Sequence, residues 1–257
     1  MDTSWEAIFK AYDIDKHDFD TSPYTISAGR IKSATSHFTR TSDKEPRILC
    51  KQDTRESRPK VFRDRGLFIL PTKNGEYIIL RGEGYVDIPI ITGVTETYHS
   101  KLDFPLETSW IGNSEMQHVD FAYASSLIRT FMNDSSLVLT IRGRKYTPLF
   151  SFHVGPHLVS TQSVQTEIDA GYEGRKQIVL VEAKNSNAGN VIILQLYYPY
   201  RQWTEEANKP VKTLFFAKYG NEYKIWLYEF TNPEDYNSVK LVKSETFIIA
   251  DPPSQTE

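Results

Sequence analysis

Cysteine is nearly absent from this chain, since Cys50 is the only one among 257 residues. A single thiol excludes an internal disulfide and a zinc site built on several thiolates. The chain also lacks an apolar run of the roughly 18 residues that a membrane span requires. Its first residues are acidic and have neither the basic start nor the apolar segment of a secretory signal. We therefore expect a globular protein of the reducing cytoplasm, with no membrane partner.

The chain lacks a net positive charge, since its formal net charge is -3, but its positive charge is concentrated in one segment. Residues 30–65 contain eleven Lys and Arg and five Asp and Glu, a local charge of +6 that leaves -9 for the remainder. Such a block is either a solvated surface or a site for nucleic-acid phosphates. The candidates in it for DNA backbone or base contacts are Arg55, Arg58, Lys60, Arg63 and Arg65.

The pattern of apolar residues divides the chain into two regions near residue 108. In the first region, helices are expected at 3–12 and near 27–38, and a hairpin of two strands at 66–70 and 76–80. Helices followed by a hairpin, with basic residues on the approach, are compatible with a winged-helix DNA-binding module. Residues 1–108 therefore form the expected DNA-recognition or auxiliary region.

A capped helix begins the second region, residues 109–257. Ser114 and Gln117 match a capping box, and apolar residues then recur at three- and four-residue steps to about Met132. Strands are expected at 137–141, 149–154, 158–168, 177–183, 214–218, 223–229 and 241–249, with a helix at 190–207. This order predicts an α/β or α+β domain.

One apolar strand ends in charged residues. Residues 178–181 are apolar at every position, as in a strand covered on both faces, and alternation places Glu182 and Lys184 on one side. Asp169 would arrive beside them if the preceding strand pairs through a glycine-containing turn. Two such carboxylates attract Mg²⁺, and the lysine can stabilise charge or help to activate water. The trio predicts phosphodiester hydrolysis, and the alternative is a surface hairpin with an incidental ion pair.

Three strings carry a resemblance to a known family: EIDAGYE at 167–173, IVLVEAK at 178–184 and QLYYPYR at 195–201. Together they resemble the active-site region of the PD-(D/E)XK nuclease superfamily, in particular of type II restriction endonucleases. The resemblance implies that Asp169 and Glu182 are metal ligands and that Lys184 orients or activates the attacking water. The proline of the motif is missing, which leaves Glu167 as an alternative first acid.

Several further residues are candidates for the site. Members of the superfamily often add a carboxylate from a preceding helix, which implies Glu115, although an acid at a helix N-terminus is favourable in any case. Gln195 can orient a water or a phosphate, or it can satisfy buried backbone groups. Arg142, Arg144 and Lys145 form a basic cluster that suits phosphate contacts or is a solvated turn.

The expected function is that of a type II restriction endonuclease, which hydrolyses phosphodiester bonds at a specific double-stranded DNA site and needs Mg²⁺. Its expected fold is a restriction-endonuclease-like mixed central sheet flanked by helices. A palindromic site would favour a homodimer, and the resemblance implies a companion DNA methyltransferase. The alternatives are a DNA repair or junction-resolving nuclease of the same fold, and a non-catalytic DNA-binding regulator.

Overall fold

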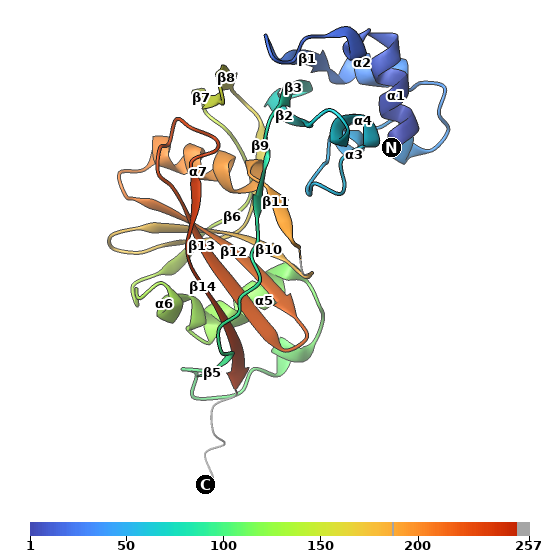
Figure 1. Ribbon diagram of the computed structural model, residues 1–257. Coiled ribbons are helices and arrows are strands. Elements are labelled where there is room, and N and C mark those ends of the chain that lie inside the picture. Colours follow the sequence, from blue (N-terminus) through green and yellow to red (C-terminus); the bar gives the residue numbers. More distant parts are fainter. Residues whose placement is uncertain (187, 251–257) are drawn as a thin grey trace.

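The computed structural model describes residues 1–186 and 188–250, without the side chains of residues 109 and 110. It shows a mixed α and β protein with two lobes, a smaller one at the N-terminus and a larger one around a central sheet (Figure 1). No helix in these two ranges is long and apolar enough to cross a membrane.

The N-terminal lobe packs short helices against a three-stranded antiparallel sheet with the strand order β1-β3-β2. Its elements are α1 (Asp2–Ala11), η1 (Ile14–Lys16), β1 (Tyr24–Ser27), α2 (Ala28–Ala34), η2 (Thr41–Asp43), α3 (Pro46–Leu49), α4 (Lys60–Arg63), β2 (Leu67–Lys73) and β3 (Glu76–Arg81). The helix at the start of the chain and the hairpin β2–β3 form where the apolar pattern and the Asn74-Gly75 turn predict them.

The hairpin of the N-terminal lobe is apolar on both faces, which fixes this lobe to the rest of the protein. Leu67 and Ile69 pack with the helices of the lobe. The alternate residues Phe68 and Leu70 belong instead to the core of the large lobe. The two lobes therefore share buried apolar surface rather than meeting through a linker alone.

The large lobe is built on a seven-stranded mixed sheet with the order β5-β14-β13-β12-β10-β9-β6. Its elements are β4 (Tyr85–Asp87), β5 (Glu96–His99), η3 (Glu107–Trp110), α5 (Glu115–Ala124), α6 (Leu127–Phe131), β6 (Val138–Tyr146), β7 (Phe150–Val154), β8 (His157–Thr161), β9 (Gln165–Glu173), β10 (Ile178–Lys184), β11 (Asn190–Ile192), α7 (Leu194–Glu206), β12 (Val211–Tyr219), β13 (Glu222–Phe230) and β14 (Val239–Ala250).

Helices cover both faces of this sheet. Val179, Val181 and Ala183 face α5 and α6 in one core cluster. Ile178 and Leu180 face α7 in the other cluster. Strand β10 is thus buried on both sides, and it runs parallel to β12 because α7 makes the crossover between them. The mixed central sheet flanked by helices agrees with the fold class expected from the sequence.

The structure differs from the sequence-based expectations at several places. The division between the lobes lies near residues 81–85 rather than at 108, because β5 pairs with β14 in the large sheet. The helix expected to continue to Met132 breaks at Ser126, which has a φ of 67°. The strand expected at 158–168 is two strands separated at Ser163, which has a φ of 58°.

The segment expected to be helical at 190–207 begins instead with a strand. Residues Asn190–Ile192 form β11, which pairs with β4, and α7 starts only at Leu194. The β-branched residues of the run VII favour this extended start. Pro199 lies inside the helix without ending it.

Candidate active site

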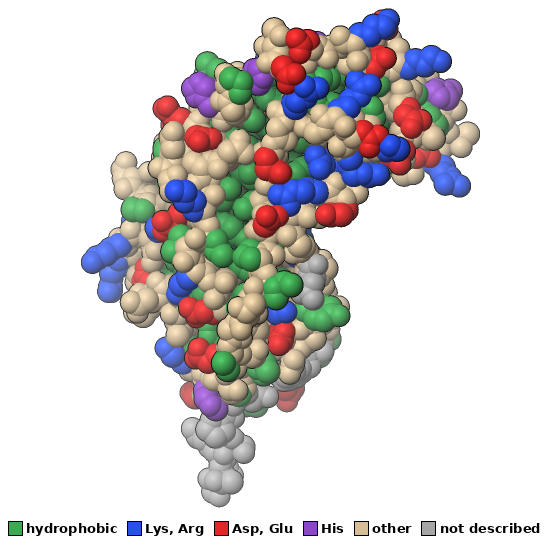
Figure 2. Space-filling view, viewed as in Figure 1, with side chains coloured by type: hydrophobic (Ala, Val, Ile, Leu, Met, Phe, Trp, Pro, Cys, Tyr) green, Lys and Arg blue, Asp and Glu red, His purple; other side chains and the backbone are tan. Residues whose placement is uncertain are grey.

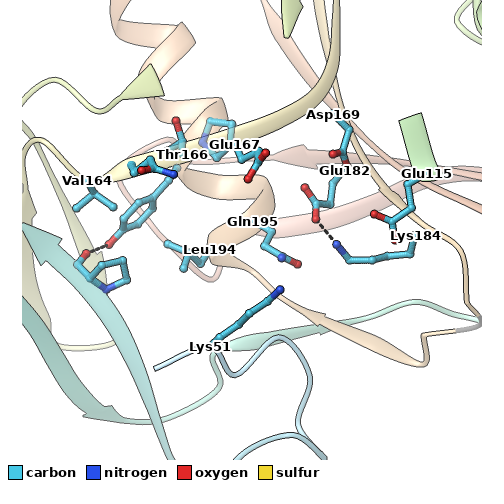
Figure 3. A pocket seen from close by; sticks show the side chains of 14 residues that line it. Lys51, Glu115, Val164, Thr166, Glu167, Asp169, Glu182, Lys184, Leu194 and Gln195 are labelled. Carbon is cyan, nitrogen blue, oxygen red and sulfur yellow. Dashed lines mark hydrogen bonds and ion pairs between the residues drawn. The ribbon is translucent and has the colours of Figure 1, made fainter. Parts of the chain in front are cut away.

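The candidate residues of the sequence analysis gather around one cavity of about 360 Å³. Glu115, Glu167, Asp169, Glu182, Lys184 and Gln195 all line it. Figure 3 shows Asp169, Glu182, Glu115 and Lys184 on one side, with Gln195 and Lys51 beside them. The cavity therefore brings together residues of β9, β10, α5 and α7. The first and last of the candidate residues, Glu115 and Gln195, are 80 positions apart in the sequence.

Strand pairing explains why the acidic residues meet. The register of β9 and β10 runs from Glu173 opposite Ile178 to Ala170 opposite Val181. Asp169 is the next residue of β9, and its Oδ2 accepts a hydrogen bond of 2.7 Å from the backbone amide of Ala183. This bond fixes the carboxylate of Asp169 beside the end of β10.

Glu182 and Lys184 form an ion pair in the cavity wall. The Nζ of Lys184 donates to Oε1 of Glu182 over 2.5 Å, and the two side chains are 23% and 11% exposed, respectively. Burial raises the pKa of Glu182 to about 7, although the charge of Lys184 opposes this shift. Burial lowers the pKa of Lys184, but the charge of Glu182 and its hydrogen bond outweigh burial, so the net direction is upward. The lysine therefore stays protonated.

Asp169 is also a carboxylate whose ionised form is disfavoured. Burial raises its pKa, the hydrogen bond from Ala183 and the charge of Lys184 lower it, and the charges of Glu115 and Glu167 raise it further. Neighbouring carboxylates with raised pKa values are a common feature of sites that bind a cation or carry out acid–base chemistry.

The first turn of α5 supplies another carboxylate. Ser114 caps the helix by accepting a hydrogen bond of 3.1 Å from the amide of Gln117, as the capping pattern predicts. Oε1 of Glu115 then accepts a hydrogen bond of 3.2 Å from the amide of Asn185, directly after β10. The cap of α5 thus sets the position of Glu115 beside the end of β10.

Gln195 and Glu167 line the cavity in different ways. Oε1 of Gln195, in the first turn of α7, is buried and has no hydrogen-bond partner within the described part of the chain. Glu167 lies at the rim, where its side chain is 60% exposed and pairs with Arg144 over 3.4 Å. Of the two alternative first acids, Asp169 is therefore the one held against β10.

The sequence analysis did not single out Lys51, which reaches the cavity from the N-terminal lobe. The segment that carries it is attached to the large lobe: Tyr85 donates its hydroxyl to the carbonyl of Gln52 over 2.9 Å, and Ile192 donates its amide to the carbonyl of Asp53 over 2.8 Å. Lys51 pairs with Asp53 over 3.3 Å. In the sequence, the only signal that pointed to Lys51 was its position in the basic block at 30–65.

The basic residues proposed for DNA binding in the N-terminal region lie outside the cavity and make contacts within the protein. Arg55 pairs with Glu83 and Asp87, Lys60 pairs with Asp64, and Arg58, Arg63 and Arg65 donate to backbone carbonyls. The four arginines therefore make contacts that hold the lobe together, and Arg55 attaches it to β4, whereas the pair of Lys60 with Asp64 is exposed.

The basic cluster on β6 is divided in the same way. Arg142 pairs with Asp120 of α5, and Arg144 pairs with Glu167 at the rim of the cavity. Lys145 is exposed and has no ion pair with a described residue. Of these three cations, Lys145 is the one with its charge available at the surface.

Metal binding at the cavity would depend on few protein ligands. Within residues 1–186 and 188–250 there is no group of three or more His, Cys, Asp or Glu side chains that could hold a metal ion. Asp169 and Glu182 are nevertheless adjacent, and each has a second carboxylate oxygen without a hydrogen bond from a described residue. Such oxygens are the ligands that Mg²⁺ prefers, and Mg²⁺ usually keeps several waters.

Comparison with known proteins gives two matches to protein-family models. One, "Domain of unknown function (DUF6997)", matches residues 81–248, and the other, "Domain of unknown function (DUF6996)", matches residues 2–79. No curated protein and no solved structure matches the chain. The two models meet where the small lobe gives way to the large one. The DUF6997 model covers more than half of the 257 residues of the chain, so the chain belongs to the DUF6997 family.

Proposed function

We propose that the protein is a Mg²⁺-dependent endonuclease that cuts double-stranded DNA at a specific site, as a type II restriction endonuclease does. The observation that carries the proposal is the meeting of Asp169, Glu182 and Lys184 at one cavity, with Glu115 and Gln195 in the same wall. A surface hairpin with an incidental ion pair would leave these groups in solvent, whereas Glu182 is only 11% exposed.

The donor set fits a small divalent cation. Asp169 and Glu182 would hold the ion, and Glu115 lines the same cavity. The buried oxygen of Gln195 has no partner among the described residues and suits a water bound to the ion. A bound Mg²⁺ would lower the pKa of a coordinated water and neutralise charge on the phosphate. The cation would also remove the cost of ionising the buried Glu182 carboxyl.

Two lysines supply fixed positive charge to the same cavity. Lys184 is kept protonated by Glu182, so it can hold a phosphate oxygen or orient the attacking water. Lys51 approaches from the other lobe and can bind a phosphate next to the one that is cut. The substrate backbone would thus lie between the two lobes.

The N-terminal lobe supports a role in DNA recognition. A helix, a strand, three short α-helices and a hairpin follow one another, and the first strand joins the hairpin to give the order β1-β3-β2. This arrangement is compatible with a winged-helix module.

The restriction-type proposal has three further parts. The protein would act as a homodimer on a palindromic site, and a companion DNA methyltransferase would protect the host DNA. Both would work in the cytoplasm.

Digestion of a sequenced, unmethylated plasmid tests the proposal. With Mg²⁺ we expect discrete, reproducible fragment ends, and none with EDTA. A smear, or preference for branched DNA, would favour the repair or junction-resolving alternative. DNA binding without any cleavage over a range of divalent cations would favour the regulator and contradict the proposal.

A further inference from the structure

We propose that the exposed surface around η2 and α3, formed by Arg40, Lys44 and Arg47, binds the phosphate backbone of duplex DNA next to the catalytic cavity. We call this set the α3 surface. The inference rests on the proposed function, and it assigns the contact to residues other than those that the sequence pattern suggested. Figure 2 shows that Lys and Arg side chains gather on the N-terminal lobe, including the concave side next to the large lobe.

Ion pairing within the lobe leaves the positive charge of the α3 surface uncompensated. The two acids of the same segment are occupied by other cations: Asp43 faces the N-terminal amine over 3.4 Å, and Glu45 faces Lys32 over 3.7 Å. Arg40, Lys44 and Arg47 are exposed, and none of them has an acidic partner within 4.0 Å among the described residues. These charges are therefore available to an anionic ligand.

The remaining arginines of the basic block differ in this respect. Arg55 is bound by Glu83 and Asp87, and Arg65 donates to the carbonyl of Asp15 over 3.0 Å. To bind DNA, these groups would have to give up contacts that hold the lobe together. The side chains of the α3 surface have no such contacts with the part of the chain that the structure describes.

The α3 surface lies close along the chain to Lys51, which lines the cavity. Lys51 lies four residues after Arg47, so their Cα atoms are at most about 14 Å apart. That limit equals the axial rise of about four base pairs, which is short enough for one duplex to contact the α3 surface and place a phosphate at Lys51 and Lys184.

The distance between the α3 surface and the cavity is fixed by the packing of the lobes. Tyr198 of α7 donates its hydroxyl to the carbonyl of Pro71 over 2.9 Å, and the amide of Gln162 donates to the carbonyl of Thr72 over 3.0 Å. Backbone contacts made from a rigid lobe set the register of a protein on DNA. The α3 surface would therefore position the duplex, while other groups read its sequence.

The test compares two triple variants of the full chain. One is Arg40→Ala, Lys44→Ala, Arg47→Ala. The matched control is Arg175→Ala, Lys176→Ala, Lys240→Ala, which removes the same charge from exposed residues at the end of the sheet away from Glu182. Binding of a labelled 30-base-pair duplex is measured with EDTA between 50 and 300 mM salt, and cleavage of plasmid DNA is measured with Mg²⁺. Thermal unfolding confirms that both variants are folded.

The α3 variant should bind the duplex about 100-fold more weakly at 0.15 M salt, because each lost phosphate contact costs about fivefold there. Its slope of log affinity against log salt should fall by about 2.7, and its cleavage should be restored at high DNA concentration. The control should bind as the wild type does. Tighter binding of duplex RNA than of DNA by the wild type would contradict the assignment to DNA.

The outcomes separate this inference from the proposed function. If the wild type cuts DNA and the α3 variant keeps wild-type affinity and slope, the inference is wrong and the proposed function stands. If the α3 variant loses binding but the wild type cuts nothing with any divalent cation, the surface stands and the nuclease proposal fails. If the wild type does not bind DNA at all, both fail.

Discussion

The backbone amide of Ala183 donates a hydrogen bond of 2.7 Å to the carboxylate of Asp169, just beyond the last paired residues of β9 and β10. The bond crosses from one strand to the other where their register ends. It holds the carboxylate of Asp169 beside the end of β10, and in the proposed function its second oxygen would share a cation with Glu182. Glu167, two residues earlier, makes no comparable contact with β10 as far as the chain is described, and it pairs with Arg144 at the rim.

Replacement of Asp169 by asparagine should therefore abolish Mg²⁺ binding at the cavity and reduce DNA cleavage by roughly 100-fold or more. Glu167→Gln is the matched control and should retain most activity. Calorimetric titration with Mg²⁺ and cleavage rates at saturating DNA measure the two effects. Equal losses in the two variants would mean that Asp169 has no special part in the site.

The raised pKa of Glu182 predicts how the stability of the metal-free protein depends on pH. In the folded state this pKa is about 7, compared with an ordinary value of 4.5. Between these values the folded state binds more protons than the unfolded state, so the free energy of unfolding falls as pH rises. The fall should reach about 3 kcal/mol by neutral pH.

Urea unfolding in EDTA at several pH values between 4.5 and 7.5 measures this effect. Glu182→Gln cannot ionise, so it should lack this part of the pH dependence and be more stable relative to the wild type near pH 7. Saturating Mg²⁺ should restore stability to the wild type near pH 7, because the cation favours the ionised carboxylate. Identical pH profiles for the two proteins would show that Glu182 titrates normally.

Lys51 should act on the substrate rather than on the metal. Lys51→Ala is expected to lower kcat/KM for DNA cleavage by about tenfold through a higher KM, since a phosphate contact is lost. Its affinity for Mg²⁺ should be unchanged, because the carboxylates of Asp169 and Glu182 remain in place. Lys10→Ala, on α1 and outside the cavity, is the control. A Lys51 variant with wild-type kinetics would remove the N-terminal lobe from the proposed active site.

Gly171 is required for close packing of the strand that carries Asp169. A Cβ at this position would lie 2.7 Å from the Cβ of Ile141 on the neighbouring β6, and neither atom can move without its backbone. Gly171→Ala should destabilise the protein by about 1–3 kcal/mol and reduce activity by displacing β9. Gly93→Ala has open space and should be neutral.

A double-mutant cycle tests this explanation. Ile141→Gly removes the Cβ that the new methyl group would meet, and by itself it leaves a cavity in a buried site and is also destabilising. Combined with Gly171→Ala, it should cost less than the sum of the two single variants, because the clash is relieved. Strict additivity in chemical unfolding experiments would contradict the steric argument.

The sequence predicted those parts of the site in which residues a few positions away determine where a side chain lies. Residues 178–184 are buried apolar positions followed by two charged ones at a spacing of two, and strand geometry alone places those two together. The N-terminus of α5 is fixed by Ser114 and Gln117, three residues apart. Each pattern lies within a few residues of the group that it positions.

The parts that the sequence did not predict depend on partners far along the chain. The amide of Arg55 donates to the side chain of Asn190, 135 positions away, and this contact helps to bring Lys51 to the cavity. The strand Glu96–His99 has one buried residue, Tyr98, so its membership of the large sheet is decided by pairing with β14. Such contacts leave no periodicity to read in a single sequence.

The most direct test of the central claim is cleavage of duplex DNA by the purified wild type and by Lys184→Ala, each with Mg²⁺ and with EDTA. The ion pair of Lys184 with Glu182 in the wall of the shared cavity predicts cutting by the wild type with Mg²⁺ alone. The variant should cut roughly 100-fold more slowly and still bind DNA. Wild-type cleavage rates in Lys184→Ala, or no cleavage by the folded wild type with any divalent cation, would contradict the claim.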